Sequence, residues 1–282
     1  MTARGALAAA VIEASHRLRL RLRSRRAGRE RTTRGVIVTL TTTPGRLPAS
    51  ETAIASLLTQ SVQPERVVLW LDEAVSDDPL PAPFERLMRA GLEVRYVQDV
   101  GPHTKLIPAL QAFPDSILIT ADDDMLYPSR WLEELLGSYR GAEGIIHCHR
   151  GHLMRSSADG TLLPYQSWDL GAPGFVGPSS LLFPTGVGGV LYPPRCLDDE
   201  VFNTAAARRL CPTADDVWFK AMALLKRTAA RKVAAESPRY RQVRAMAPVA
   251  LYRENLTRND EQIRATFEAY DLYRLLERGS SG

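Results

Sequence analysis

Short apolar runs alternate with amphipathic segments along the first half of the chain. The apolar runs are rich in Val, Ile and Leu and are bounded by turn residues, which is typical of strands. The segments between them repeat apolar residues every three to four positions, as helices do. The predicted strands are 36–40, 66–72, 92–97, 117–120 and 144–149, and the predicted helices are 48–60, 84–90, 104–111 and 131–139. This alternation predicts βαβ crossovers, and therefore an α/β fold with a mostly parallel central sheet flanked by helices.

The second half of the chain is less regular. Residues 150–185 are rich in Gly, Pro and Ser, and a long irregular region of this kind usually shapes a binding site. The elements expected after it are a glycine turn with an apolar strand over 185–194, an apolar helix over 215–225 and an amphipathic helix over 259–277. No internal repeat or linker is evident, so we expect one domain, residues 35–282, after an N-terminal tail, residues 1–34.

The tail carries most of the positive charge. The whole chain has a formal net charge of +4. Residues 1–34 contain ten Arg and two Glu, a net of +8, so the other 248 residues carry −4. The basic balance therefore gives no reason to expect nucleic-acid binding by the folded part. The tail has two interpretations: an amphipathic segment on an anionic membrane surface, or a solvated, poorly ordered extension.

Cysteine usage and hydropathy favour a cytoplasmic protein. Cys148, Cys196 and Cys211 are odd in number and lack metal-ligand spacing, which predicts free thiols in a reducing compartment. No apolar run approaches the ~20 residues of a membrane span. We therefore expect a cytoplasmic location, with peripheral contact at the inner face of the cell membrane only through the tail.

Three consecutive carboxylates, Asp122, Asp123 and Asp124, follow the predicted strand 117–120. Like charges packed this closely repel, and a divalent cation that prefers oxygen ligands, such as Mg²⁺ or Mn²⁺, would relieve the repulsion. In an extended segment Asp122 and Asp124 would share one face and Asp123 would point away. An acidic loop or a helix N-cap explains the isolated triplet equally well.

Other polar groups are expected at the same edge of the sheet. In parallel α/β sheets, ligands bind beyond the carboxyl ends of the strands. The turn 41–46 follows the first predicted strand, Asp72 ends the second, and the acidic triplet follows the fourth. These three groups are therefore candidates for one binding site.

A series of short blocks, in order, carries a family resemblance. The blocks are VIVTLTTTPGR, LLTQS, VVLWLD, TKLIPAL, ITADDDMLYP, TGVGGVLYPP and ADDVW. Over about residues 35–260 they resemble GT-A-type glycosyltransferases, and in particular the bacterial glycosyltransferases related to family 2 that build surface polysaccharides. The resemblance implies a Rossmann-like GT-A fold, a nucleotide-diphosphate sugar donor, a glycan or lipid-linked acceptor, and a Mn²⁺ or Mg²⁺ ion.

The resemblance also implies a role for each matching residue. Asp122 and Asp124 would hold the metal, and Asp216 or Asp215 would be the catalytic base, with Asp216 favoured. Both lie at a predicted helix start, where the dipole favours the ionised form; we expect one to cap the helix and the other to accept the acceptor's proton, with inversion at the sugar. The residues that would border the nucleotide sugar are Thr41, Thr42, Arg46, Asp72, Lys105, Asp123, Gly186, Gly188 and Gly189. Of these, Asp123 would also serve the turn.

The sequence departs from the family pattern in its histidines. Many members of this fold have a histidine near the C-terminus that contacts the metal or diphosphate, whereas this chain has none after His152. Arg253 or Arg258 would replace that contact. His147, His149 and His152 have metal-like spacing but are more simply explained as hydrogen-bonded core residues. Trp168 and Trp218 could each stack on a sugar or simply pack in the core, and packing is the simpler explanation for Trp218, on an apolar helix.

Two rival functions remain open at this point. A sugar-nucleotidyltransferase also needs a Rossmann-like sheet and Mg²⁺-binding carboxylates, but usually has a Gly-rich, basic loop after its first strand; TTTPGR lacks that glycine density. A non-catalytic protein that binds through the basic tail is the second rival.

Overall fold

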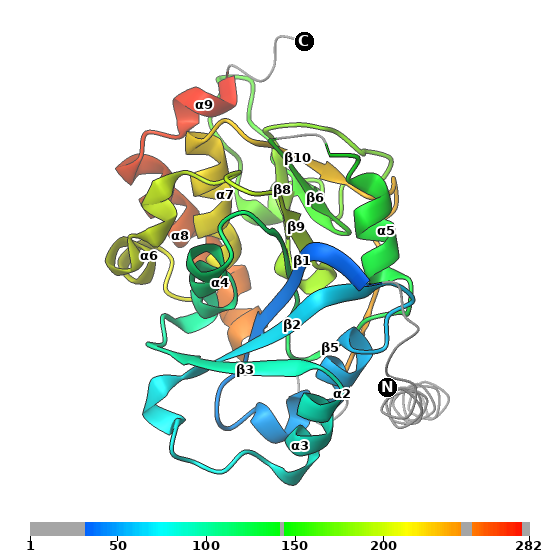
Figure 1. Ribbon diagram of the computed structural model, residues 1–282. Helices are drawn as coiled ribbons and strands as arrows, with labels where there is room; N and C mark the ends of the chain where they lie inside the picture. The colour runs from blue at the N-terminus through cyan, green and yellow to red at the C-terminus, as the bar shows by residue number, and fades with distance from the viewer. Residues whose placement is uncertain (1–31, 142–143, 244–249, 278–282) are drawn as a thin grey trace, which may run out of the picture.

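A seven-stranded sheet forms the centre of the computed structural model, which describes residues 32–141, 144–243 and 250–277, without the side chains of 250–257 (Figure 1). Its strands are β1 (Thr32–Thr41), β2 (Gln63–Asp72), β3 (Leu92–Val97), β4 (Ile117–Thr120), β6 (Ile145–Cys148), β9 (Val190–Tyr192) and β10 (Ala229–Lys232). All neighbouring pairs are parallel except those of β9, which runs antiparallel to both β4 and β6. The predicted fold class, an α/β domain with a mostly parallel central sheet, is confirmed.

The strand order places β1 at a reversal of the chain's path. The order across the sheet is β3-β2-β1-β4-β9-β6-β10. The chain therefore steps outward from β1 to β2 and β3, and then returns to add β4 on the other side of β1. In open α/β sheets, ligands bind at such a switch point, outside the carboxyl ends of the two strands.

Alternating side chains of the central strands supply two hydrophobic layers. Val36, Val38 and Leu40 of β1 belong to one buried cluster, and Ile37 belongs to the other, as the period of two in a strand requires. The first layer is covered by α2 (Leu47–Leu57), α3 (Ala82–Arg89) and α5 (Trp131–Ser138), and the second by α4 (Ile107–Ala112), α6 (Thr204–Leu210), α7 (Asp215–Leu225) and α8 (Ala250–Ala269).

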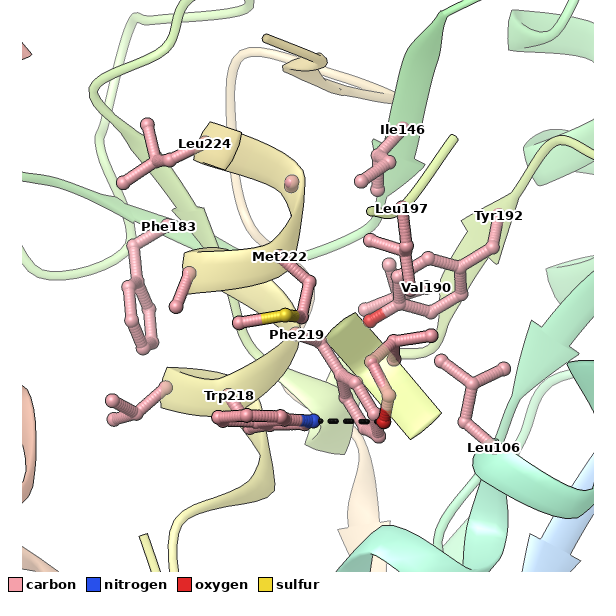
Figure 2. Packing of buried hydrophobic residues seen from close by; sticks show 14 of the residues in the cluster. Leu106, Ile146, Phe183, Val190, Tyr192, Leu197, Trp218, Phe219, Met222 and Leu224 are labelled. Carbon is pink, nitrogen blue, oxygen red and sulfur yellow. Dashed lines mark hydrogen bonds between the residues drawn. The ribbon is translucent and has the colours of Figure 1, made fainter. Parts of the chain in front are cut away.

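Helix α7 is the most deeply packed helix of the second layer. Phe219 packs edge-on against Tyr192 of β9, with ring centroids 6.0 Å apart, and the indole N–H of Trp218 donates to the carbonyl of Val201 at 3.2 Å (Figure 2). The second tryptophan, Trp168, is also buried. The packing interpretation is therefore confirmed for Trp218, and Trp168 packs in the same way.

Small elements complete the fold around the sheet. Two short antiparallel pairs join β5 (Met125–Leu126) to β11 (Arg241–Gln242) and β7 (Gly151–Leu153) to β8 (Leu182–Pro184). The 3₁₀ helices are η1 (Glu73–Val75), η2 (Gly101–Lys105), η3 (Tyr165–Ser167), η4 (Gly186–Gly188) and η5 (Asp199–Phe202), and α9 spans Tyr273–Glu277.

Several predicted boundaries differ from the structure. Strand β1 begins at Thr32, three residues inside the predicted tail, and the rest of the tail lies outside the described residues. The C-terminal helix begins earlier, at Ala250, and ends at Ala269, because Asp271 adopts a φ of +51° that interrupts it before α9. Among the described residues, no helix has the length and apolar character of a membrane span. The predicted free thiols are confirmed, since Cys148, Cys196 and Cys211 are buried and unbridged.

Candidate active site

The carboxyl ends of β1 and β4 bring the predicted nucleotide turn beside the acidic triplet. The two strands are paired in register from Val36 with Ile117 to Thr39 with Thr120, so the residues that follow them leave the sheet side by side. Thr42 follows β1, and the triplet follows β4. The predicted meeting of these two segments at one edge of the sheet is confirmed.

The triplet itself is not extended. Asp123 and Asp124 form a turn between β4 and β5, and the backbone N–H of Asp122 donates to the hydroxyl of the buried Tyr127 at 2.8 Å. The expectation that Asp122 and Asp124 share a strand face is therefore wrong, because the strand ends at Thr120. Their assignment as metal ligands does not depend on that face and stays a prediction.

Asp123 and Asp124 are tied to the loop after β1. The Thr42 hydroxyl donates to Asp123 at 2.5 Å, and the Arg46 guanidinium lies 2.6 Å from Asp123 and 3.1 Å from Asp124. The side-chain amide of Gln242 also donates to Asp124, at 3.0 Å. Burial raises the pKa of Asp123, and the contacts with Thr42 and Arg46 oppose that shift. Asp123 thus serves the turn, while Arg46 neutralises part of the triplet's charge.

Asp122 faces a different cation, Lys105. The Lys105 ammonium lies 2.7 Å from Asp122 and 3.2 Å from Asp215, at the start of α7. Burial alone would lower the pKa of Lys105, but Asp122, Asp215 and Asp216 outweigh burial and raise it well above its usual value. Lys105 ends the 3₁₀ helix η2 rather than starting an α-helix, so its place in the site comes from these carboxylates and not from a helix N-terminus.

Asp215 and Asp216 occupy the first two positions of α7, and neither caps it. The N-cap position is Ala214, which has no side-chain hydrogen bond. Asp216 instead accepts the backbone N–H of Gly186 on both oxygens, at 3.0 and 3.1 Å. The expectation that one of the two acids caps the helix is wrong. The carboxylate of Asp216 accepts its hydrogen bond from the N–H of Gly186 and not from an N–H of the first turn of α7.

The ionisation state of Asp216 also differs from the prediction. Burial and the neighbouring Asp215 raise the pKa of Asp216 to about 8, against the opposing effects of Lys105 and the Gly186 N–H. Burial and Asp215 therefore favour the protonated form of Asp216, and the helix dipole alone does not determine its ionisation. A group with this pKa readily gains and loses a proton near neutrality.

The three glycines have different neighbours. A Cβ on Gly186 would lie 3.2 Å from Asp216, 3.4 Å from the Lys105 ammonium and 3.7 Å from Asp122, so this glycine covers the charged cluster directly. A Cβ on Gly188 would meet Arg150 at 2.9 Å, and one on Gly189, where φ is +90°, would meet Trp131 at 2.4 Å. Close packing against protein accounts for the last two glycines, and their predicted contact with the sugar stays a prediction.

Thr41 and Asp72 lie at the same edge, on neighbouring parallel strands. The Thr41 hydroxyl donates to the carbonyl of Trp70 at 2.9 Å, and Asp72 caps η1 by accepting the N–H of Ala74 at 3.1 Å. Their described hydrogen bonds are therefore local. Their predicted contacts with the nucleotide stay predictions, and so does the exchange of a family histidine for Arg253 or for Arg258, which is exposed on α8.

His103 is a buried residue of the site that the sequence did not indicate. It lies on η2, two residues before Lys105, and packs edge-on against Phe219 of α7. Its Nδ1 lies 3.1 Å from the carbonyl of Val100, whereas its buried Nε2 has no hydrogen-bond partner among the described residues. Burial lowers the pKa of His103, and the negative charge of Asp215 partly opposes that shift. No motif marked this histidine, because its importance comes from the packing of η2 on α7.

The three histidines with metal-like spacing are used in the core. His147 contacts the Ser138 hydroxyl at 2.6 Å, His149 contacts the carbonyl of Trp131 at 2.9 Å, and the N–H of Gly171 donates to His152 at 2.8 Å. Burial lowers the pKa of all three, to about 4, 4 and 3 respectively. The core interpretation of these histidines is confirmed.

The charge balance of the site leaves room for a cation. Asp122, Asp123, Asp124, Asp215 and Asp216 lie around two basic side chains, Arg46 and Lys105. Even with Asp216 protonated, the four other carboxylates outnumber the two basic side chains, so negative charge is in excess. Within the described ranges, no group of three or more His, Cys, Asp or Glu side chains is arranged as a complete metal site. The donor chemistry, carboxylate oxygens in excess, fits a hard divalent ion such as Mg²⁺ or Mn²⁺.

Comparisons with known proteins give the following. No protein-family model matches the chain. No curated protein matches it either. Among solved structures, it is similar to a CMP:2-keto-3-deoxy-manno-octonic acid synthetase complexed with CTP, with 13% identity over 75% of this chain and 92% of that chain, and a TM-score of 0.40.

Two further solved structures are similar at the same distant level. One is S. aureus TarS 1-349, with 13% identity over 73% of this chain and 59% of that chain, and a TM-score of 0.42. The other is a 4-diphosphocytidyl-2C-methyl-D-erythritol synthase, with 8% identity over 51% of this chain and 72% of that chain, and a TM-score of 0.34. Likenesses this low carry no argument about function.

Proposed function

We propose that the protein is a metal-dependent GT-A-type glycosyltransferase. It would move a sugar from a nucleotide-diphosphate donor to a hydroxyl of a glycan or lipid-linked acceptor, with inversion at the sugar. The supporting sequence observation is the ordered resemblance over about residues 35–260, including the bacterial family 2 blocks. The protein would then take part in the synthesis of a bacterial surface polysaccharide.

One structural observation carries the proposal. Two acidic segments about ninety residues apart in sequence, the turn after β4 and the start of α7, are joined by the Lys105 ammonium. They meet at the switch point of the sheet, where α/β proteins bind ligands. A transferase that separates a phosphate leaving group from a nucleophile needs this division: one group of charges for the phosphates, and one carboxylate for the proton.

Asp122 and Asp124 are the residues that would hold Mn²⁺ or Mg²⁺. A divalent ion there would supply positive charge to the leaving diphosphate. Without added positive charge, the carboxylate excess of this site would repel a diphosphate. Lys105 and Arg46 would then be free to approach the donor's phosphates, Thr41, Thr42 and Asp72 would border the nucleotide, and the turn Gly186–Gly189 would lie along the sugar.

Asp216 would act as the base. It would accept the proton of the acceptor hydroxyl as that oxygen attacks the anomeric carbon and the bond to the diphosphate breaks. Asp216 is only half-buried, whereas Asp215 is buried against Lys105, which supports Asp216 as the residue that reaches the acceptor. Asp215 would influence the reaction through its charge, since it helps to raise the pKa of Asp216.

The test is a thermal-shift panel on the full chain. Nucleoside diphosphates and nucleotide sugars are added with and without Mn²⁺, and a Mn²⁺-dependent shift by one nucleoside identifies the donor base. An Asp122→Ala/Asp124→Ala variant is expected to lose that shift. No shift with any nucleotide, or a variant that keeps full turnover, would contradict the proposal.

Product analysis separates this function from sugar-nucleotidyl transfer, which the same carboxylates would also suit. A glycosyltransferase consumes a nucleotide sugar and releases a nucleoside diphosphate. A nucleotidyltransferase consumes a nucleoside triphosphate and a sugar phosphate and releases pyrophosphate. Pyrophosphate as the product would replace the proposal by the alternative.

The tail provides a separate test of the non-catalytic alternative. A chain without residues 1–31 is expected to keep turnover in detergent and to lose binding to vesicles that contain anionic lipid. Complete loss of function in that variant, with the fold intact, would favour a protein that acts through its basic tail.

A further inference from the structure

Lys220 is a buried lysine that the proposed reaction does not use. It lies on α7, one turn after Asp216, and is almost fully buried. Its ammonium donates to the backbone carbonyl of Ser180 and, at 2.9 Å, to that of Leu182. Burial lowers the pKa of Lys220 to about 7. An ammonium in such a place is costly unless its donors are satisfied, so these two carbonyls are what hold it there.

The two carbonyls belong to the segment that delivers Gly186 to the site. Leu182 begins β8, which ends at Pro184, and Gly186 follows two residues later. Helix α7 therefore contacts this segment twice. Lys220 contacts the beginning of the segment, and Asp216 contacts its end, at Gly186. Asp216 and Lys220 are four residues apart and lie on the same side of the helix. Both also line one small pocket, together with Pro184 of β8.

We propose that Lys220 is a positioning residue that clamps the start of β8 to α7 and so holds the N–H of Gly186 on the Asp216 carboxylate. Its importance for catalysis rests on the proposed function, in which Asp216 is the base. The clamp itself is a property of the fold. Helix α7 would then carry both the base, Asp216, and Lys220, which keeps the Gly186 N–H directed at that base.

The physical consequence follows from the hydrogen bond. An N–H that donates to a carboxylate favours its ionised form, so loss of the Gly186 contact would raise the pKa of Asp216 further. The other charged groups that act on Asp216 are Asp215 on α7 and Asp122 after β4, which raise its pKa, and Lys105 on η2, which lowers it. The described contacts of Lys220 are with backbone carbonyls rather than with these three side chains.

Lys232 offers a matched control. It is also buried, and its ammonium donates to three carbonyls, those of Gly171, Ala172 and Ala235, at 2.7, 2.7 and 2.8 Å. It therefore fixes the same irregular region as Lys220 does, but not the strand that leads to Gly186. Removing either lysine removes a buried charge and its bonds to backbone carbonyls, whereas only one removal should affect Asp216.

The experiment compares Lys220→Met with Lys232→Met in the full chain. Hydrogen exchange of the Gly186 amide reports the contact, and carboxyl ¹³C NMR, assigned with Asp216→Asn, reports the pKa of Asp216. In Lys220→Met we expect the amide to exchange about tenfold faster and the pKa to rise by about one unit. In Lys232→Met neither quantity should change.

Three outcomes would overturn the proposal. In the first, Lys220→Met keeps both the amide protection and the pKa. In the second, the pKa rises while the amide stays protected, which would be an effect of charge alone. In the third, Lys232→Met changes Asp216 as much as Lys220→Met does. Should Lys220→Met not fold, Lys220→Gln, whose shorter side chain cannot span both carbonyls, replaces it with the same expected result. Neither readout needs a substrate, so failure of the clamp is distinguishable from failure of the proposed function.

Discussion

The two acidic segments joined by Lys105 are held by different kinds of contact. In the turn after β4, the carboxylates of Asp123 and Asp124 share the Arg46 guanidinium, and Asp123 also accepts a hydroxyl hydrogen bond. At the start of α7, the hydrogen bond that the described residues give Asp216 comes from a backbone N–H, and an acidic neighbour repels its charge. In the turn, both of these carboxylates are in contact with a cation, whereas at the start of α7 the Lys105 ammonium is in contact with Asp215 and acts on Asp216 only from a distance.

This difference suits two different tasks. Carboxylates paired with cations keep a fixed place and can exchange one cation for another, as binding of a metal and a diphosphate requires. A carboxyl group with a pKa near 8 changes its protonation state near neutral pH, as a base must. The comparison therefore predicts that variants of the α7 segment change turnover and pH dependence, whereas variants of the turn change binding and stability.

The largest expected effect is on turnover at the α7 segment. Asp216→Ala removes the proposed base, and kcat should fall by about 10²- to 10⁴-fold. The Mn²⁺-dependent thermal shift by the nucleotide should persist, because the turn after β4 is intact. Steady-state kinetics and the thermal-shift panel measure the two properties.

The matched variant at this segment is Asp215→Ala. The Asp215 side chain contacts Lys105 and is not the proposed base, so this variant should reduce turnover less than Asp216→Ala does. The reverse order would exchange the roles of the two acids, and full turnover in both variants would remove the base from α7.

The next largest effect is on stability, at the residue that joins the two segments. Lys105→Met leaves Asp122 and Asp215 without their cation, and breaking a buried ion pair from one side costs about 3–5 kcal/mol of unfolding free energy. Urea unfolding in the presence of a chelator measures the loss. Lys226→Met, at an exposed lysine one residue past α7, should change stability by less than about 0.5 kcal/mol. Equal stability in the two variants would mean that Lys105 does not hold the segments together.

A smaller effect is expected in the pH dependence of stability. The pKa of Asp216 is raised from 3.8 to about 8 by folding, so the folded state holds more protons than the unfolded state between these values. The contribution of Asp216 to stability should therefore be greatest at acid pH and should fall as the pH rises toward 8. The Asp216→Asn variant has no titratable group at this position. Its stability relative to the natural protein should rise with pH in that window and level off above it.

Unfolding at several pH values in chelator tests this dependence. Asp115→Asn serves as the control, because Asp115 is 78% exposed and its ion pair in the described part of the chain is with an exposed arginine. It should follow the natural protein at every pH. A flat difference for Asp216→Asn would show that Asp216 is ionised in the free protein, and the contrast between the two segments would then disappear.

The sequence predicted the first segment better than the second. The strands through β4 and the triplet follow from local patterns, because β-branched runs bounded by turn residues specify strands whatever packs on them. Strand β10, with the sequence AARK, lacks such a pattern and forms through its pairing with β6. The conformation of the triplet also escaped prediction, since the end of β4 at Thr120 depends on how the chain turns into β5.

The features of the second segment that the sequence did not indicate are set by tertiary packing. The acids at 215 and 216 are visible in the sequence, but the N–H that Asp216 accepts comes from Gly186, thirty residues away. The unpartnered nitrogen of His103 and the carbonyls held by Lys220 are likewise known only once η2 and β8 are packed on α7. Contacts between a side chain and a distant backbone group do not depend on the identity of the residue that supplies the backbone group, so they leave no sequence motif.

The smallest predicted effect tests the hydroxyl contact of the turn. Thr42→Val keeps the shape of the side chain but removes the hydrogen bond to Asp123, and a bond to a charged group contributes about 1.5–3 kcal/mol. Because Arg46 remains on Asp123, we expect a loss near the lower end of that range, measured by urea unfolding at neutral pH. Thr43→Val changes the exposed neighbouring threonine and should have no measurable effect. The bond lowers the pKa of Asp123, so the loss should shrink in acid, as the carboxyl group becomes protonated in both proteins. A loss that is constant with pH would mean that Thr42 contributes by packing alone, and the turn would then depend on Arg46 for its charge compensation.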